Sequence, residues 1–188
     1  LLALLDITER QRIEAELRVA ASVYENLNEG VLITDADNRI VAVNPAFTGL
    51  TGYTEAEAVG QTPSLLRSGR QDAAFYSVLW QSVLGTGQWQ GELVNRRKSG
   101  AEFAERLSIH TVYDWRGQVL RRIGVFSDIT EQRRMADSIW RQASFDGLTR
   151  LANRRFAQER LEQKIGRMAR TGRQLALLFI GLDQFKSV

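Results

Sequence analysis

Asn95 is the polar residue with the clearest potential for chemistry inside a folded domain. It ends a strand predicted over Gln88–Arg97, and alternation places four residues of that strand on one face: Trp89, Gly91, Leu93 and Asn95. A buried asparagine beside aromatic and aliphatic side chains needs hydrogen-bond partners. A bound flavin or small acid could supply them, and so could the backbone of the nearby turn. The sequence leaves both interpretations open.

Other reactive side chains are scarce. The chain has no cysteine, which excludes disulfides, thiolate nucleophiles and cysteine-ligated metals. Its single histidine, His110, ends a second predicted strand over Glu102–His110, on the face opposite Phe103, Leu107 and Ile109. We expect that face to meet solvent, so His110 is predicted to be a surface residue and not a metal ligand.

The charge pattern argues against nucleic-acid binding. The net charge is +3, but the basic residues are interleaved with Asp and Glu, and the densest basic runs, Asn95–Lys98 and Gln132–Arg134, are short. A nucleic-acid binder gathers its charge on one face. With 44% hydrophobic and 25% charged residues, the composition is that of an ordinary globular protein.

Membrane and export signals are not evident in this sequence. No apolar run approaches the roughly 20 residues that span a bilayer, and Leu1–Leu5 is too short for a signal peptide. The apolar start without Met suggests a fragment of a longer chain. We expect a cytoplasmic protein, with membrane attachment only if the parent has upstream segments.

An internal repeat marks two junctions. Asp-Ile-Thr-Glu followed by basic and Gln residues occurs at 6–12 and again at 128–134, an offset of 128 − 6 = 122 residues. Each copy follows an apolar stretch that could be a strand, Leu1–Leu5 or Ile123–Phe126. The Asp-x-x-Glu spacing is typical of a helix capping box. The sequence therefore predicts the same strand-to-helix junction twice.

The two predicted connector helices carry apolar seams. In the first, from about Glu9 to Asn26, the seam follows spacings of four and three: Ile13, Leu17, Ala20, Tyr24 and Leu27. It predicts a parallel coiled coil between two copies, although so short a seam also fits an amphipathic helix packed on its own domain. The second connector, Glu131–Ala143, carries Met135 and Ile139, with the polar Gln142 at the next seam position.

Between the connectors, the pattern predicts an α+β fold. Strands are expected at Val31–Thr34, Arg39–Val43, Gln88–Arg97, Glu102–His110 and Val119–Ser127. Asn44 is expected to cap a short helix with Pro45 in its first turn, and a longer helix is expected over Gln71–Leu84 with Phe75, Leu79 and Val83 on one face. The order predicts a five-stranded antiparallel sheet with helices on one face.

Residues 22–130 resemble a PAS domain of the bacterial sensory-box type. The matching stretches, in order, are Gly30–Asp35, Asn44–Phe47, Thr51–Tyr53, Val59–Gly60, Phe75–Tyr76, Leu79–Trp80, Trp89–Glu92, Asn95–Gly100 and Asp128–Thr130. Residues 1–8 resemble the tail of a preceding PAS domain, and residues 9–21 form the connector helix. The resemblance implies the PAS fold, flanked by connector helices.

A PAS domain that holds a ligand holds it between the sheet and the helices. The candidate pocket residues are Phe47, Trp80, Trp89, Asn95, Phe103 and Phe126, which could instead form an aromatic core. Trp89–Glu92 and Asn95–Lys98 resemble segments of flavin-binding redox sensors, so FAD or another small molecule remains open as the ligand. The photoreactive flavin subclass needs a cysteine, and haem-binding PAS domains ligate iron through a helix-side histidine. The sequence disfavours both.

Two later stretches, Asp146–Arg154 and Leu178–Lys186, resemble the opening of a GGDEF domain, the module of bacterial diguanylate cyclases. Residues 131–144 would be the signalling helix and residues 145–188 the first part of this α/β domain, without its catalytic loop. Asn153 fits a helix cap, and the following helix is expected to turn Phe156, Leu161, Ile165 and Met168 inward. Leu175–Ile180 is suited to a buried central strand.

One residue departs from the GGDEF pattern. The family carries a metal-binding Asp where this chain has Gly181, whereas Asp183, Phe185 and Lys186 match. A carboxylate suits the hard cation that neutralises charge in phosphoryl transfer. Because glycine offers none, we expect a poor or inactive cyclase, unless a nearby carboxylate or water replaces the ligand. The fragment is expected to have no enzymatic activity.

The resemblances together predict a sensory and relay fragment of a bacterial cyclic-di-GMP signalling protein. A signal in the PAS domain would pass through Asp128 and Thr130 into the signalling helix, and the flanking helices would form a homodimer. The parent could be a cyclic-di-GMP phosphodiesterase or a diguanylate cyclase. Two alternatives are part of an active cyclase and a PAS domain that binds nothing and serves only as a dimerisation scaffold.

Overall fold

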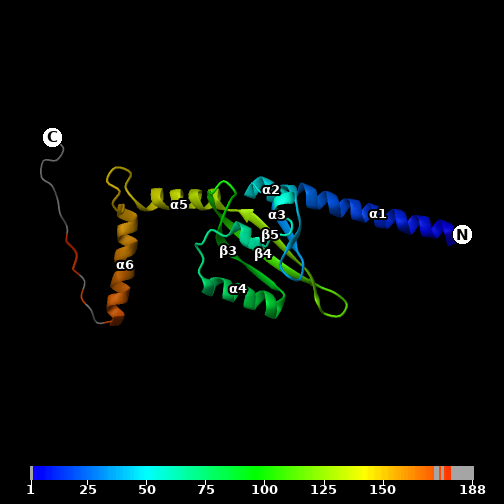
Figure 1. Ribbon diagram of the computed structural model, residues 1–188. Coiled ribbons are helices and arrows are strands. Elements are labelled where there is room, and N and C mark those ends of the chain that lie inside the picture. Colours follow the sequence, from blue (N-terminus) through cyan, green and yellow to red (C-terminus); the bar gives the residue numbers. More distant parts are fainter. Residues whose placement is uncertain (1, 172–173, 175, 179–188) are drawn as a thin grey trace. The chain divides into compact units, whose positions relative to one another are not determined.

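The computed structural model describes residues 2–171, 174 and 176–178. The chain divides into two compact units, residues 1–132 and 133–188, each described here by itself (Figure 1). Within the described ranges, no helix combines the length and the apolar character needed to cross a bilayer.

The first unit is built on one antiparallel sheet of five strands in the order β2-β1-β5-β4-β3. Its strands are β1 (Gly30–Thr34), β2 (Ile40–Val43), β3 (Gln88–Arg96), β4 (Glu102–Tyr113) and β5 (Val119–Asp128). The predicted sheet is confirmed. Because β5 pairs with both β1 and β4, its inward residues lie in the middle of the layer.

The segment between β2 and β3 carries the helices of the domain: α2 (Pro45–Thr51), α3 (Glu55–Ala58), the 3₁₀ helix η1 (Pro63–Leu66) and α4 (Ala73–Thr86). The longest, α4, lies against β3 (Figure 1). Asn44 caps α2 as predicted, because its Oδ1 accepts from Phe47 N at 3.0 Å, and the same oxygen accepts from Val31 N at 2.8 Å. One amide side chain thus caps α2 and attaches it to β1.

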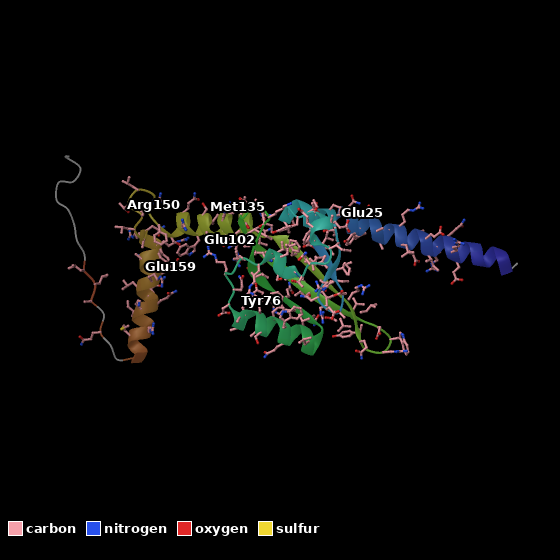
Figure 2. The ribbon with its side chains drawn as sticks, viewed as in Figure 1. Glu25, Tyr76, Glu102, Met135, Arg150 and Glu159 are labelled. Carbon is pink, nitrogen blue, oxygen red and sulfur yellow. The ribbon has the colours of Figure 1, made fainter. Side chains whose placement is uncertain are left out.

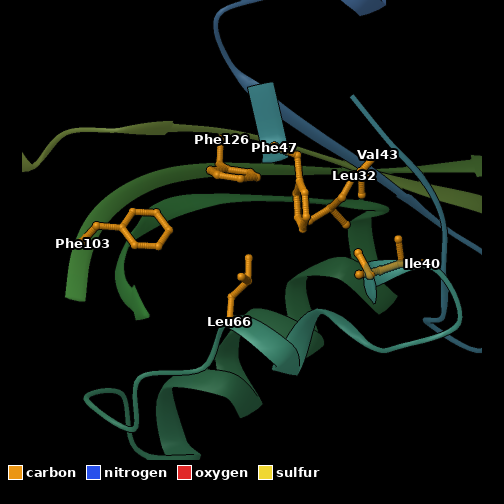
Figure 3. Close-up of a cluster of buried hydrophobic side chains, with 8 residues drawn as sticks. Leu32, Ile40, Val43, Phe47, Leu66, Phe103 and Phe126 are labelled. Carbon is orange, nitrogen blue, oxygen red and sulfur yellow. The ribbon is translucent and has the colours of Figure 1, made fainter. Parts of the chain in front are cut away.

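The hydrophobic core lies between the sheet and these helices (Figure 3). Its centre holds three fully buried phenylalanines, Phe47 of α2, Phe103 of β4 and Phe126 of β5. Phe47 and Phe126 meet edge to face with ring centroids 6.0 Å apart. Each buried aromatic side chain contributes roughly 1.5–3 kcal/mol of transfer free energy, so this cluster holds α2 against the sheet.

The N-terminal connector is one continuous helix, α1 (Leu2–Asn26). The strand expected at Leu1–Leu5 is wrong for residues 2–5, and Asp6 lies inside the helix instead of capping it. A strand needs a neighbouring strand for its backbone hydrogen bonds, whereas a helix satisfies its own. The last turn of α1 is attached to the domain, since Asn44 Nδ2 donates to Tyr24 O at 3.2 Å.

At the second junction, the predicted strand end and helix start are confirmed. Helix α5 (Thr130–Ser144) begins directly after β5, and Asp128 Oδ1 accepts from Thr130 N at 2.8 Å. The apolar seam residues of α5 are exposed, with Met135 at 62% and Ile139 at 66% (Met135 is labelled in Figure 2).

The second unit contains α6 (Arg154–Thr171) and the loop before it. Asn153 caps α6 as predicted, because its Oδ1 accepts from Phe156 N at 2.9 Å. In the loop, Asp146 Oδ1 accepts from both the backbone and the hydroxyl of Thr149, at 2.9 and 2.8 Å. These hydrogen bonds hold the pKa of Asp146 below its usual value. The polar residues of this motif therefore shape the turn that leads into α6.

Two expectations for the second unit are wrong. In the strand predicted over Leu175–Ile180, the described residues 176–178 are exposed and lie outside any strand. Ile165 of α6 is 53% exposed, although Phe156, Leu161 and Met168 are half-buried. A central strand is stabilised by strands and helices on both sides, and the described residues provide none beside it. The described part of the chain does not include Gly181, Asp183, Phe185 or Lys186.

Candidate ligand-binding site

A cavity of about 390 Å³ lies between the inner face of the sheet and the segment from η1 to α4. Its apolar lining includes Leu32, Leu79, Leu93, Leu107 and Ile109, and its polar lining is Thr34, Asn38, Ser64, Arg67, Asn95 and Arg122. Tyr76 (Figure 2) and Trp80 of α4 add aromatic surface. Small-molecule sites in proteins usually measure roughly 300–1,000 Å³ and combine an apolar lining with a few polar groups. The cavity has both properties.

The predicted pocket residues separate into two groups. Trp80 and Asn95 line the cavity. Phe103 of β4 and Phe126 of β5 lie on the cavity's face of the sheet, but with Phe47 of α2 they pack together in the core, each at most 1% exposed. Alternation along a strand identifies the face of Phe103 and Phe126 but not their position between core and cavity.

Trp89 does not line the cavity either. Its ring packs edge to face on Phe75 of α4, with centroids 5.9 Å apart. It also covers Gly91, where an added Cβ would lie 2.4 Å from Trp89 Cζ2. Trp89 therefore fastens α4 to β3 beside the cavity.

Among the described residues, the side-chain amide of Asn95 donates to a carboxyl group and not to the turn backbone. Asn95 Nδ2 donates to Glu105 Oε1 at 2.9 Å, and the two residues are 7% and 2% exposed. Burial raises the pKa of Glu105 to about 7, and the nearby Asp128 raises it too, although the bond from Asn95 lowers it. Glu105 Oε2 has no hydrogen-bond partner among the described residues.

A buried guanidinium lies at the end of the cavity away from Asn95. Arg122 of β5 is 8% exposed, and its guanidinium carbon lies 5.6 Å from the centroid of the Trp80 ring. Its Cα partner across the sheet is Thr34 of β1, which is 1% exposed. The cavity therefore has an asparagine at one end and an arginine with a threonine at the other.

The sequence analysis missed both Glu105 and Arg122, although period-two alternation could have found them. Glu105 falls on the same face of β4 as Phe103, and Arg122 falls on the same face of β5 as Phe126. A charged residue on an otherwise apolar face is an informative observation.

The predicted coupling residues sit in one polar cluster at the end of β5. Asp128 forms an ion pair with Arg97, and Thr130 Oγ1 accepts from Ala104 N at 2.9 Å. Burial opposes ionisation of Asp128, but the hydrogen bonds from Thr130 and Arg97 outweigh it and hold the pKa of Asp128 below its usual value. The cluster joins the start of α5 to β4.

The chain matches two family models. The PAS fold model matches residues 20–129, and the diguanylate cyclase GGDEF domain model matches residues 143–188. Among solved structures, the PAS domain of a Colwellia psychrerythraea protein has a TM-score of 0.58 at 23% identity, covering 61% of this chain and 98% of that one. An RNA-binding light-oxygen-voltage receptor has a TM-score of 0.60 at 23% identity, covering 66% of this chain and 36% of that one. Identities this low show the fold alone.

Curated relatives match between about half and most of the chain. The nitrogen fixation regulatory protein of Klebsiella oxytoca is 30% identical over 109 residues, 58% of this chain and 22% of its own length. Cyclic di-GMP phosphodiesterase PdeB of Shewanella oneidensis is 29% identical over 87% of this chain and 18% of its own length. Probable diguanylate cyclase DgcE of Escherichia coli is 27% identical over 87% of this chain and 15% of its own length. The chain thus spans between 15% and 22% of these relatives, belongs to the PAS family, and continues from its PAS domain into the opening part of a GGDEF domain.

Proposed function

We propose that this chain is the sensory and relay part of a cyclic-di-GMP signalling protein. A small molecule occupies the PAS cavity, and the Asp128–Thr130 junction passes its presence to the GGDEF domain. Two relatives, one named a cyclic-di-GMP phosphodiesterase and one a probable diguanylate cyclase, match across 87% of the chain. Matches that extend over both the PAS and the GGDEF part of this chain support a sensor joined to a cyclic-di-GMP output.

The observation that carries this proposal is a series of neighbouring groups from the cavity to the start of α5. Asn95 lines the cavity and donates to Glu105. Glu105 lies opposite Asp128 in the β4–β5 register, and Asp128 accepts from Thr130, the first residue of α5. A change at the cavity wall therefore reaches the junction through adjacent polar groups.

A ligand acts on this series by engaging Asn95. If it competes with Glu105 for the Asn95 amide, Glu105 loses the hydrogen bond that favours its charged form. The resulting change in charge alters the electrostatic field at Asp128. Such a relay requires two junction arrangements within a few kcal/mol of each other, and a ligand that binds them with different affinity.

A double-mutant cycle in the full-length protein tests the relay without a known ligand. Asn95→Leu removes the cavity end of the series, and Asp128→Ala removes the junction end. We expect Asn95→Leu to change cyclic-di-GMP turnover in the wild-type background but not in the Asp128→Ala background, because coupled residues act non-additively. The measurement is cyclic-di-GMP formed or hydrolysed per unit time, together with the unfolding temperature of each variant.

Glu102→Gln is the matched control, because Glu102 (Figure 2) lies on β4, the strand of Glu105, but pairs at the surface with Arg70. It should leave the effect of Asn95→Leu intact. Equal effects of Asn95→Leu in the wild-type and Asp128→Ala backgrounds would sink the relay.

The GGDEF domain of the full-length protein is, on this proposal, a weak or inactive cyclase. Gly181 supplies no carboxylate where the family binds its divalent metal. Unmodified full-length protein should turn over GTP poorly, and Gly181→Asp should raise the rate. Robust GTP turnover by the unmodified protein would contradict this proposal and favour the alternative of an active diguanylate cyclase.

A dimerisation scaffold is the second candidate function. Ile13 and Leu17 of α1 are 51% and 64% exposed, and Met135 and Ile139 of α5 are similarly exposed. Exposed apolar residues at seam spacing favour pairing of two copies through these helices. A solution mass twice that of the chain would support the dimer. A protein that only dimerises would show no change in turnover on Asn95→Leu.

A further inference from the structure

The guanidinium of Arg122 is incompletely satisfied. Its Nη1 donates to Ala36 O at 2.9 Å, but the buried Nε has no hydrogen-bond partner in the described part of the chain. No carboxylate of the described residues forms an ion pair with it. Arginine keeps its charge in proteins, and a buried charge without a partner is strongly unfavourable. Arg122 therefore keeps a buried donor that an anionic group can satisfy.

Thr34 adds a second unsatisfied group at the same place. Its Oγ1 is buried and has no hydrogen-bond partner within the described residues. Thr34 and Arg122 are cross-strand neighbours, and both line the cavity. A hydroxyl donor and a guanidinium fork thus meet on one wall.

The rest of the cavity supports a ligand with one negative charge and an apolar body. Among the described residues, its lining includes two arginines, Arg67 and Arg122, and no Asp or Glu. Arg67 is exposed and covers the Tyr76 ring at 4.6 Å, whereas Arg122 is buried. Only one cation therefore lies deep in the cavity, beside leucine side chains.

We propose that the cavity binds an organic monocarboxylate, whose carboxylate is held by Arg122 and Thr34 and whose apolar body lies against Leu32, Leu79 and Leu107. A planar carboxylate accepts two parallel N–H bonds from one arginine edge, and one carboxylate matches one deep guanidinium. This inference rests on the proposed sensory function, since it names the class of molecule that the PAS domain detects.

Binding of defined acids to the 188-residue chain tests the site. The probes are benzoate, phenylacetate, hexanoate and octanoate, each beside its primary amide, measured by calorimetry and by the shift in unfolding temperature. At least one acid should bind, and its amide should bind at least about tenfold more weakly. Arg122→Met and Thr34→Val should each weaken binding of that acid by about ten- to a hundredfold.

Arg121→Met is the matched control. Arg121 is the next residue along β5 but is exposed, so its loss should change affinity by less than about twofold. Arg122→Met should unfold at a temperature no lower than wild type without ligand, because it removes an uncompensated charge. If it fails to fold, Thr34→Val, which is close to isosteric, carries the same test.

Several results would overturn the carboxylate site. They are no binding by any of the four acids, equal binding of acids and amides, or equal losses in Arg121→Met and Arg122→Met. Binding of inorganic phosphate or a flavin nucleotide through Arg122 instead of the acids would do so too. Failure of the relay would look different: the acids would bind, but turnover of the full-length protein would not respond.

Discussion

Glu105 is a carboxylic acid in the interior of the sheet with one amide partner, the side chain of Asn95. Its pKa of about 7, mainly due to burial, lies well above the ordinary value of 4.5. Near neutral pH, small changes around Glu105 therefore shift it between the neutral and the charged form. It is the group in the cavity-to-junction series whose charge is easiest to change.

Glu105 should make the stability of the domain fall as pH rises. Between pH 4.5 and about 7, the folded state keeps the Glu105 proton and the unfolded state has lost it, so each increment of pH favours unfolding. Glu105→Gln removes this effect. The variant should gain stability relative to wild type from about pH 5 to about pH 8, by up to about 3 kcal/mol.

Chemical denaturation of wild type and Glu105→Gln at about pH 5 and about pH 8 measures this difference in the free energy of unfolding. Glu102→Gln is the control on the same strand. Interactions with Arg70 and Arg96 lower the Glu102 pKa, so its pH effect falls in the acid range. A stability difference between wild type and Glu105→Gln that is constant from about pH 5 to about pH 8 would rule out a neutral, buried Glu105.

For single residues, strand alternation in the sequence indicates buried polar groups that the motifs do not include. Asn95 was recognised as a polar residue on an apolar face, and the structure supplies its partner in Glu105. Glu105 and Arg122 lie on apolar strand faces beside aromatic residues, and aromatic residues are typical of both cores and cavities. No sequence pattern could show that Phe103 and Phe126 pack together, because that depends on how strands far apart in the chain align.

At the scale of elements, alternation and turn residues predicted each strand of the sheet. The β4 strand runs to Tyr113, beyond the predicted end at His110, because its ladder with β5 continues to Tyr113 and Val119. The ends of strands depend on pairing partners that a single segment does not reveal. The same limit explains Leu2–Leu5, an apolar run that fits a strand or a helix until its neighbours are known.

The junction at the start of α5 is hydrogen-bonded to β4. The backbone of Ala104 is hydrogen-bonded to two successive residues of this junction. Ala104 O accepts from Ile129 N at 2.8 Å, and Ala104 N donates to Thr130 Oγ1 at 2.9 Å. Glu105 is the next residue of β4. On the proposed relay, a displacement of β4 caused at the cavity would reach the first residues of α5 through these two hydrogen bonds.

In the PAS domain as a whole, β4 contacts both the cavity and the junction cluster. The cavity lies on the inner face of β4 through Leu107 and Ile109, and the junction cluster is attached to Ala104. The proposed relay therefore requires that Glu105, beside the cavity wall, and Asp128 influence each other. The electrostatic effect of Asp128 on Glu105 is the part of this coupling that can be measured without any ligand.

The most direct test is a titration of the Glu105 carboxyl group by carbon-13 NMR in wild type and in Asp128→Asn. In wild type the pKa should be about 7. Asp128→Asn should lower it, because removing a neighbouring negative charge favours ionisation of Glu105. If Glu105 titrates near 4.5 in wild type, or at the same pH in both proteins, the cavity wall and the junction are not coupled and the account is contradicted.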